Sequence, residues 1–169
     1  FFPSLWTSLK VFYLYLLKTV APYHLSNDYS FNQIPIIQNP LSHYEVYIGA
    51  LILLALVYVA WKKRGNVYGL SAAIFLLTYL PVSNWFVKTG TIMGERLMYM
   101  PSLGLVIMAV VAVESLRSKI LKSKLVLVPC LLFLVSLFAW YGYIIIDRNR
   151  DWRTEVSIIT SGYEASPRS

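Results

Sequence analysis

Two short polar motifs interrupt an otherwise apolar chain, and both carry residue types that could bind a ligand. The first is Glu95-Arg96, directly before a long apolar run. An arginine at such a position suits a phosphate group, because the guanidinium fork binds two oxygens at once. The second is Asp28-Tyr29, which places a carboxylate beside a phenol. Local roles stay open for both motifs: an ion pair between Glu95 and Arg96, and a solvated turn at Asp28.

The motifs of soluble enzymes are missing from the sequence. It contains no glycine-rich phosphate loop, no HExxH helix motif and no CxxC pair. His24 and His43 bracket a long loop, but no other candidate ligands accompany them, so we interpret them as interfacial histidines. The single cysteine, Cys130, lies inside an apolar stretch and is interpreted as a small packing residue. The sequence therefore predicts no metal site.

The apolar stretches that position these motifs have the length of membrane spans. The chain has 169 residues, of which 57% are hydrophobic, and each stretch is close to the roughly 20 residues that cross a bilayer core. We therefore predict an all-α, polytopic membrane helix bundle over residues 1–146, followed by a polar tail over 147–169. The predicted spans are residues 5–21, 44–61, 67–87, 97–116 and 125–146.

The charges indicate how these spans are oriented. The net charge of +7 would suggest nucleic acid in a soluble protein, but here basic residues concentrate in the loops 62–66 and 117–124. Basic loops face the cytosol in membrane proteins. Alternation then places loops 22–43 and 88–96, together with the tail, on the opposite side. Nucleic acid is therefore not an expected partner, whereas the lipid bilayer is.

Two lysines make the first span the least regular. We expect Lys18 to extend towards the outer interface. Lys10 is expected near the cytosolic interface of a shortened span, with a polar cavity as the alternative. The loop that follows, residues 22–43, has no Lys or Arg and contains three prolines and several aromatic residues. We interpret it as a re-entrant or membrane-resting loop with a fixed conformation.

The polar tail has the periodicity of one amphipathic helix. Asp151 is a plausible N-cap and Glu155 falls in the first turn. The spacing fits a tetratricopeptide helix as well as an ordinary amphipathic helix. The apolar residues spaced to share one face are Trp152, Val156, Ile159 and Tyr163.

Three ordered segments carry a family resemblance. They read NDYSFNQIPII, GERLMYMPSLG and RNRDWRTE, and apolar spans separate them. In this order they resemble the transmembrane-and-tetratricopeptide-repeat O-mannosyltransferases. The resemblance implies a GT-C-like membrane fold in the endoplasmic reticulum, with the tail in the lumen as the start of a repeat array. It also implies dolichyl-phosphate mannose as donor lipid and Ser/Thr hydroxyls of lumenal proteins as acceptors, of cadherin type in an animal.

The resemblance also suggests roles for the two polar motifs. Arg96 is the candidate for binding the donor phosphate, with Glu95 orienting it, and Asp28 and Tyr29 are expected to shape the lumenal mouth of the site. The catalytic carboxylate of such enzymes lies in the first lumenal loop, which we expect upstream of this sequence, and Asp28 is not its counterpart. The chain begins Phe-Phe-Pro and is expected to be a piece of a longer polypeptide.

Two other functions fit parts of the sequence. A transporter subunit would carry ionisable residues in the middle of its spans, whereas Lys10 and Glu114 lie near span ends. A non-catalytic scaffold whose lumenal repeats bind a partner stays open, because the tail alone does not exclude it. Acidic residues in the first lumenal loop of the full-length chain would favour the enzyme.

Overall fold

The described part of the chain is helical and contains no strand. The computed structural model describes residues 2–23, 25, 26, 29, 33–85, 90–120 and 124–166. The all-α prediction is therefore confirmed. Its long helices are α1 (Phe2–Val20), α2 (Tyr44–Lys62), α3 (Val67–Tyr79), α4 (Tyr99–Ile120), α5 (Lys124–Asp151) and α6 (Glu155–Ala165), with short 3₁₀ turns at η1 (Pro40–Ser42), η2 (Leu80–Val82) and η3 (Glu95–Met98).

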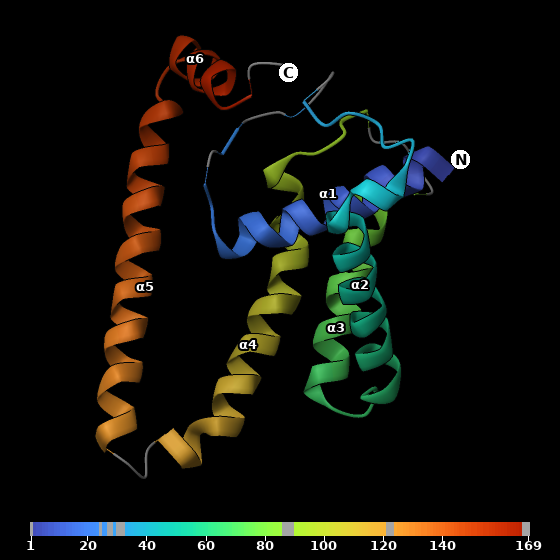
Figure 1. The fold of residues 1–169 in the computed structure, drawn as a ribbon. Coiled ribbons are helices and arrows are strands. Elements are labelled where there is room, and N and C mark those ends of the chain that lie inside the picture. The colour runs from blue at the N-terminus through green and yellow to red at the C-terminus, as the bar shows by residue number, and fades with distance from the viewer. Residues whose placement is uncertain are drawn as a thin grey trace.

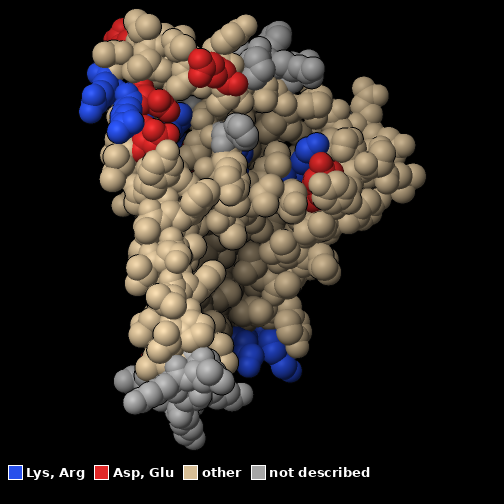
Figure 2. Space-filling view, turned by 60° about the vertical axis from the view of Figure 1, so that its left-hand side comes forward, with Lys and Arg blue, Asp and Glu red and all other residues tan. Residues whose placement is uncertain are grey.

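Three of the described helical stretches are long and apolar enough to cross a membrane, and they indicate a membrane protein. They are Tyr44–Lys62, Glu95–Leu116 and Leu127–Asp151. In the last of these no residue of the apolar window is buried within the chain, so its side chains are available to lipid. Figure 2 shows a wide uncharged belt between charged groups at the two ends of the molecule. The prediction of five spans is not confirmed by this count.

Helix α3 is shorter than the span predicted over 67–87. It ends at Tyr79 and continues only as the 3₁₀ turn η2. Pro81 explains the end, because it has no N–H to donate to a carbonyl of the preceding turn. The Ser83 hydroxyl then donates to the carbonyl of Leu80 at 2.7 Å. The apolar helix therefore covers Val67–Val82.

Helix α1 lies across one end of the bundle, whereas α2, α3, α4 and α5 run alongside one another (Figure 1). Its early residue Thr7 accepts a hydrogen bond from Ile37 N, and its late residues Thr19 and Val20 accept from the Tyr141 hydroxyl. These contacts are separated by about 20 Å of helix, yet all lie at the same end of the bundle. We call this the site end. The structure therefore gives no support to a span over 5–21.

Lys10 lies at the site end. Its ammonium is 3.4 Å from Glu45 Oε1 in the first turn of α2. The expectation that Lys10 lies near the opposite, cytosolic interface is therefore wrong, and the physical reason is this ion pair. The exposed basic turn Lys62–Arg64, the end of α4 and the start of α5 lie at the other end of the bundle (Figure 1).

An aromatic core holds α1 against α3. Phe12 and Tyr15 of α1 are almost fully buried, as are Phe75 and Tyr79 of α3. The rings of Phe12 and Tyr79 are 5.0 Å apart, and those of Phe75 and Tyr79 stack at 5.8 Å. Aromatic pairs in these geometries contribute more than their buried area alone. The core therefore fixes α1 against the C-terminal half of α3.

Two glycines allow the helix backbones to approach closely. A Cβ at Gly49 of α2 would lie 2.4 Å from the carbonyl oxygen of Leu9, and one at Gly104 of α4 would lie 2.6 Å from that of Ser71. Small residues have this role in membrane helix packing. The crossings of α1 with α2 and of α3 with α4 therefore depend on them.

Helix α5 continues to Asp151, further than the predicted span, and a tight junction leads into α6. The N-cap of α6 is Thr154, whose hydroxyl accepts from Ser157 N, and Ser157 completes a capping box. The expectation of Asp151 as N-cap is wrong, because Asp151 ends α5 in an ion pair with Arg148 at 2.8 Å. The Ser157 hydroxyl also donates to the carbonyl of Asp151, so the angle between α5 and α6 is fixed by local hydrogen bonds.

Candidate functional site

The segment before α4 is attached to α1 at Tyr15. Gly94 N donates to the Tyr15 hydroxyl at 2.9 Å, and that hydroxyl lies 3.2 Å from the Gly94 carbonyl, to which it donates. Both residues are buried. Because the backbone of Gly94 is bound on both its N–H and its carbonyl, the position of the following residues Glu95 and Arg96 is well defined.

Glu95 is bound by the loop that follows α1. Its Oε1 accepts from the Tyr29 hydroxyl at 2.5 Å and from Ser26 N at 2.9 Å. Ser26 and Tyr29 are buried, and burial raises the pKa of the Tyr29 phenol well above its usual range. The hydrogen bond to Glu95 and the charge of Glu95 raise this pKa further, while the charge of Arg148 acts in the opposite direction. Tyr29 therefore stays neutral and donates to Glu95.

Arg96 is exposed, unlike its neighbour. Within the described residues no acidic side chain forms an ion pair with Arg96. The proposed local pair between Glu95 and Arg96 is thus not seen, because the Glu95 carboxylate is occupied by Tyr29 and Ser26. Consecutive residues of a helical turn also point in different directions. If Glu95 orients Arg96, it does so by holding the backbone of the η3 turn, from which the Arg96 side chain projects.

A pocket of about 320 Å³ brings Arg96 close to a second cation, Lys18. The Lys18 ammonium donates to the carbonyl of Tyr23 at 2.9 Å and lies 5.2 Å from the centre of the Tyr29 ring. Two cations and one carboxylate therefore line the same cavity. Its lining consists of Tyr15, Lys18, Thr19, Pro22, Leu25, Glu95, Arg96, Met98, Tyr99 and Ser102.

This arrangement suits an anionic group carried by an amphipathic molecule. Arg96 presents an exposed guanidinium, and Met98 and Leu25 supply apolar surface beside it. A guanidinium binds phosphate oxygens in a bidentate manner. Among the described residues no group of three or more His, Cys, Asp or Glu side chains is placed to hold a metal ion. The pocket therefore offers two side-chain cations, beside one carboxylate that is already hydrogen-bonded, to an anionic group.

The sequence identified some of these residues and missed others. It selected Glu95, Arg96 and Tyr29, and the structure brings Tyr29 and Glu95 into contact. Asp28 and His24 lie outside the described residues, so the role expected of Asp28 at the mouth stays a prediction. Tyr15 and Ser26 were missed, because a tyrosine and a serine in apolar surroundings carry no local signal of their partner. Lys18 was expected at the outer interface, and only the fold places it beside Arg96.

Comparison with known proteins agrees with the resemblance drawn from the three motifs. The chain is 25% identical over 162 residues to protein O-mannosyl-transferase F38B6.6 of Caenorhabditis elegans. It is 28% identical over 169 residues to TMTC1 of Mus musculus, which covers 94% of the chain. The curated relatives of this chain are named protein O-mannosyl-transferases. The resemblance is thereby confirmed.

The similarity extends over most of this chain but over a small part of each relative. The F38B6.6 match covers 96% of the chain and 22% of the C. elegans O-mannosyl-transferase, and the TMTC1 match covers 17% of the mouse protein. A third relative, the O-mannosyl-transferase tmtc2 of Xenopus laevis, is 31% identical over 60% of the chain and 12% of its own length. No family model matches the chain, and no solved structure matches it.

Proposed function

We propose that this chain forms part of an integral-membrane protein O-mannosyltransferase that transfers mannose from dolichyl-phosphate mannose to Ser/Thr hydroxyls. The observation that carries the proposal is the similarity to named O-mannosyl-transferases over 94–96% of the chain in two relatives. The apolar helices support it, because a lipid-linked donor requires an enzyme embedded in the bilayer.

The pocket lined by Lys18 and Arg96 supports a role in donor binding. In an inverting transfer, a carboxylate supplied by another part of the full-length protein deprotonates the acceptor hydroxyl. The lipid phosphate leaves with a negative charge, and a positioned cation stabilises it. Arg96 is the proposed ligand of that phosphate. Glu95, held by Tyr29 and Ser26, fixes the turn from which Arg96 projects.

We further propose that the protein resides in the endoplasmic reticulum membrane with its site end and C-terminal tail in the lumen. The separation of the basic turn Lys62–Arg64 from the site end supports this orientation (Figure 1). The acceptors are then lumenal proteins, of cadherin type in an animal. The tail is proposed to begin a tetratricopeptide array.

The test is a transfer assay with the purified full-length protein. Radiolabelled dolichyl-phosphate mannose and a folded acceptor domain are supplied, and mannose on the acceptor is measured. We expect transfer that saturates with donor concentration. The absence of transfer with all folded acceptor domains tested, for protein that is monodisperse and correctly inserted, would count against the proposed reaction.

A further inference from the structure

A second cavity lies at the site end, where the loop after α1, the last turns of α5 and the C-terminal half of α6 meet. Figure 1 shows α6 lying over the end of α5. The volume of the cavity is about 450 Å³, within the range of ligand-binding cavities. Three carboxylates and one guanidinium give its described lining a net charge of −2. We call it the acidic cavity, and its charged residues are Asp147, Arg148, Asp151 and Glu164.

The three carboxylates of the acidic cavity differ in their partners. Asp151 is 2.8 Å from Arg148, whose side chain is only 17% exposed, so these two charges compensate each other. Asp147 lies 3.8 Å from Arg150, but both side chains are more than 60% exposed, and solvent-exposed pairs are weak. Glu164 forms no ion pair within the described part of the chain. The negative charge of the cavity therefore remains largely available at Glu164 and Asp147.

Three aromatic side chains line the same cavity as these carboxylates. Tyr23, Trp140 and Tyr143 are 57%, 44% and 68% exposed. The rings of Tyr23 and Trp140 contact each other edge to face, with 5.8 Å between their centres. Aromatic rings attract cations, and tryptophan does so most strongly. A cation in this cavity would therefore meet both carboxylates and aromatic rings.

Hydrogen bonds outside the acidic cavity hold its three walls together. The Tyr141 hydroxyl of α5 donates to the carbonyl of Val20 at 2.9 Å, which joins α5 to the end of α1. The Ser157 hydroxyl donates to the carbonyl of Asp151 at 2.8 Å, which joins α6 to the end of α5. A ligand would thus meet a surface that is formed before it binds.

From these observations we propose that the acidic cavity binds a basic side chain, arginine or lysine, of a polypeptide. Both side chains carry a cation on a long stem, and a guanidinium also stacks on aromatic rings. The ammonium of a phospholipid headgroup is disfavoured, because its phosphate would face the net negative charge of the lining. Among the described residues no three acidic, His or Cys side chains are placed to hold a metal ion.

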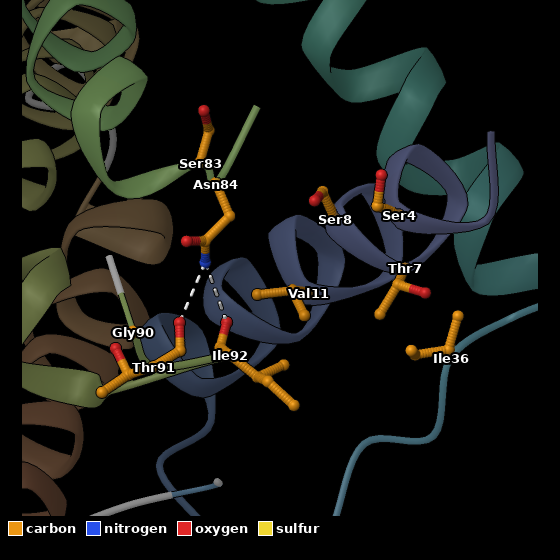
Figure 3. Close-up of a pocket in the computed structure, with 10 residues that line it drawn as sticks. All are labelled: Ser4, Thr7, Ser8, Val11, Ile36, Ser83, Asn84, Gly90, Thr91 and Ile92. Carbon is orange, nitrogen blue, oxygen red and sulfur yellow. Dashed lines mark hydrogen bonds between the residues drawn. The ribbon is translucent and has the colours of Figure 1, made fainter. Parts of the chain in front are cut away.

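The cavity along the N-terminal half of α1 does not share this chemistry. Its volume is about 500 Å³, and none of the described residues that line it is charged. Its polar side chains have partners within the protein: Asn84 Nδ2 donates to the carbonyl of Thr91 at 3.0 Å (Figure 3), and the Thr7 hydroxyl accepts from Ile37 N. A cationic ligand therefore finds compensating charge in the acidic cavity and not beside the start of α1.

The acidic cavity adjoins the pocket that contains Arg96. Pro22 and Leu25 line both of them. A polypeptide whose basic side chain is bound in the acidic cavity therefore lies next to the two cations Lys18 and Arg96. Under the proposed function that polypeptide is the acceptor, and this identification alone rests on the proposed function. Binding of the basic side chain does not.

The experiment measures peptide binding to the full-length protein in an uncharged detergent, by saturation-transfer NMR. The probes are the acetylated and amidated pentapeptides Gly-Gly-Arg-Gly-Gly and Gly-Gly-Lys-Gly-Gly, and a third in which citrulline replaces arginine. Citrulline has nearly the shape of arginine but no charge. We expect saturable binding of at least one basic peptide, with the citrulline peptide weaker by about tenfold or more. Higher salt should weaken the binding, because the exposed carboxylates are then screened.

Two substitutions in α6 locate the binding in the acidic cavity. Glu164→Gln keeps the shape of an exposed side chain and should weaken binding of the basic peptides about threefold to tenfold, as one partly exposed charge contact is lost. Ser161→Lys places a cation three residues before Glu164 on the same helix, so it should compete internally and abolish peptide binding. Glu155→Gln is the matched control, because this exposed carboxylate at the start of α6 is not part of the described lining.

Four results would overturn the proposal: no saturable binding of either basic peptide, equal binding of the citrulline peptide, unchanged binding in both Glu164→Gln and Ser161→Lys, or displacement of the basic peptides by phosphocholine. The last result would assign the cavity to a lipid headgroup. The measurement involves no transfer step, so its outcome is independent of whether the protein transfers mannose.

Discussion

Lys10 and Glu45 form an ion pair, with 3.4 Å between Nζ and Oε1, that joins the middle of α1 to the first turn of α2. His43 Nδ1 lies 3.7 Å from the other carboxylate oxygen of Glu45. Both side chains of the pair are 18% exposed, so solvent screens it less than a surface pair. A helix that spans the bilayer from the opposite side would not place Lys10 beside Glu45.

Exchanging these two charges tests the position of α1. Lys10→Glu should lower the melting temperature, because two carboxylates then face each other, and adding Glu45→Lys should restore most of the loss. The coupling should be about 1 kcal/mol, measured by thermal unfolding of the full-length protein in detergent. Arg150 and Asp147 are the control pair, since their side chains are 67% and 62% exposed, and their exchange should have no measurable effect. Absence of rescue would contradict the crosswise position of α1.

Arg96→Lys separates phosphate binding from a structural role. The substitution keeps the charge and removes the bidentate fork. We expect the donor concentration for half-maximal transfer to rise about tenfold or more, since a hydrogen bond to a charged group contributes roughly 1.5–3 kcal/mol. Arg153→Lys, at an exposed position between α5 and α6, is the control. Wild-type donor saturation in a well-folded Arg96→Lys protein would remove Arg96 from the site.

Tyr29→Phe tests the attachment of Glu95. The variant leaves the carboxylate with only the Ser26 N–H among the contacts described here, and we expect the free energy of unfolding to fall by about 1.5–3 kcal/mol. Tyr99→Phe is the matched control, because Tyr99 is 81% exposed. In a Glu95→Gln background the effect of Tyr29→Phe should shrink. An equal effect in both backgrounds would show that Tyr29 does not act through Glu95.

Gly104→Ala tests the close approach of α3 and α4. The added Cβ would lie 2.6 Å from Ser71 O and 2.7 Å from Phe75 N, both of which are backbone atoms that move only with the helix. We expect a loss of about 1–3 kcal/mol in stability. Gly142→Ala in α5 is the control, because a Cβ there meets nothing within 4 Å, and it should be neutral or stabilising by up to about 1 kcal/mol. Similar melting temperatures for the two variants would contradict this packing.

The exposed face of α6 should become covered when the chain continues beyond residue 169. Val156, Ile159 and Tyr163 are 66–74% exposed, and repeat helices bury such a face only against a neighbour. In a Cys130→Ser background, Ile159→Cys should react with a water-soluble maleimide in a protein that ends at residue 169, and should be protected in a protein that includes a downstream repeat. Thr160→Cys, at the polar edge of the same helix, should react in both. Unchanged labelling of Ile159→Cys would count against a repeat array.

Length and hydropathy predicted α2, α4 and α5 well, because an apolar stretch of about 20 residues leaves few alternatives. They did not predict the position of α1. The partners of Lys10 and Tyr15 are Glu45 and Gly94, which are distant in the sequence, and no local pattern encodes such pairs. The apolar character of α1 fits burial under loops as well as a place in lipid.

The site was predicted in part for the same reason. A guanidinium before an apolar run made Arg96 a candidate, and Glu95 was interpreted as its partner because the two residues are adjacent. In the structure the Glu95 carboxylate instead accepts a hydrogen bond from Tyr29, 66 residues away. The predicted N-cap of α6 was also wrong. Asp151 is a residue type that often caps helices, but it forms an ion pair with Arg148 at the end of α5. Thr154 is the N-cap of α6.

The junction between α5 and α6 determines the direction of α6. Asp151, Thr154 and Ser157 fix the angle of α6 relative to the last turn of α5. Each residue of an α-helix turns the chain by about 100° and advances it by about 1.5 Å. One residue added to or removed from α5 would therefore rotate α6 by about 100° around the axis of α5. The length of α5 therefore determines the direction in which α6 extends from the site end.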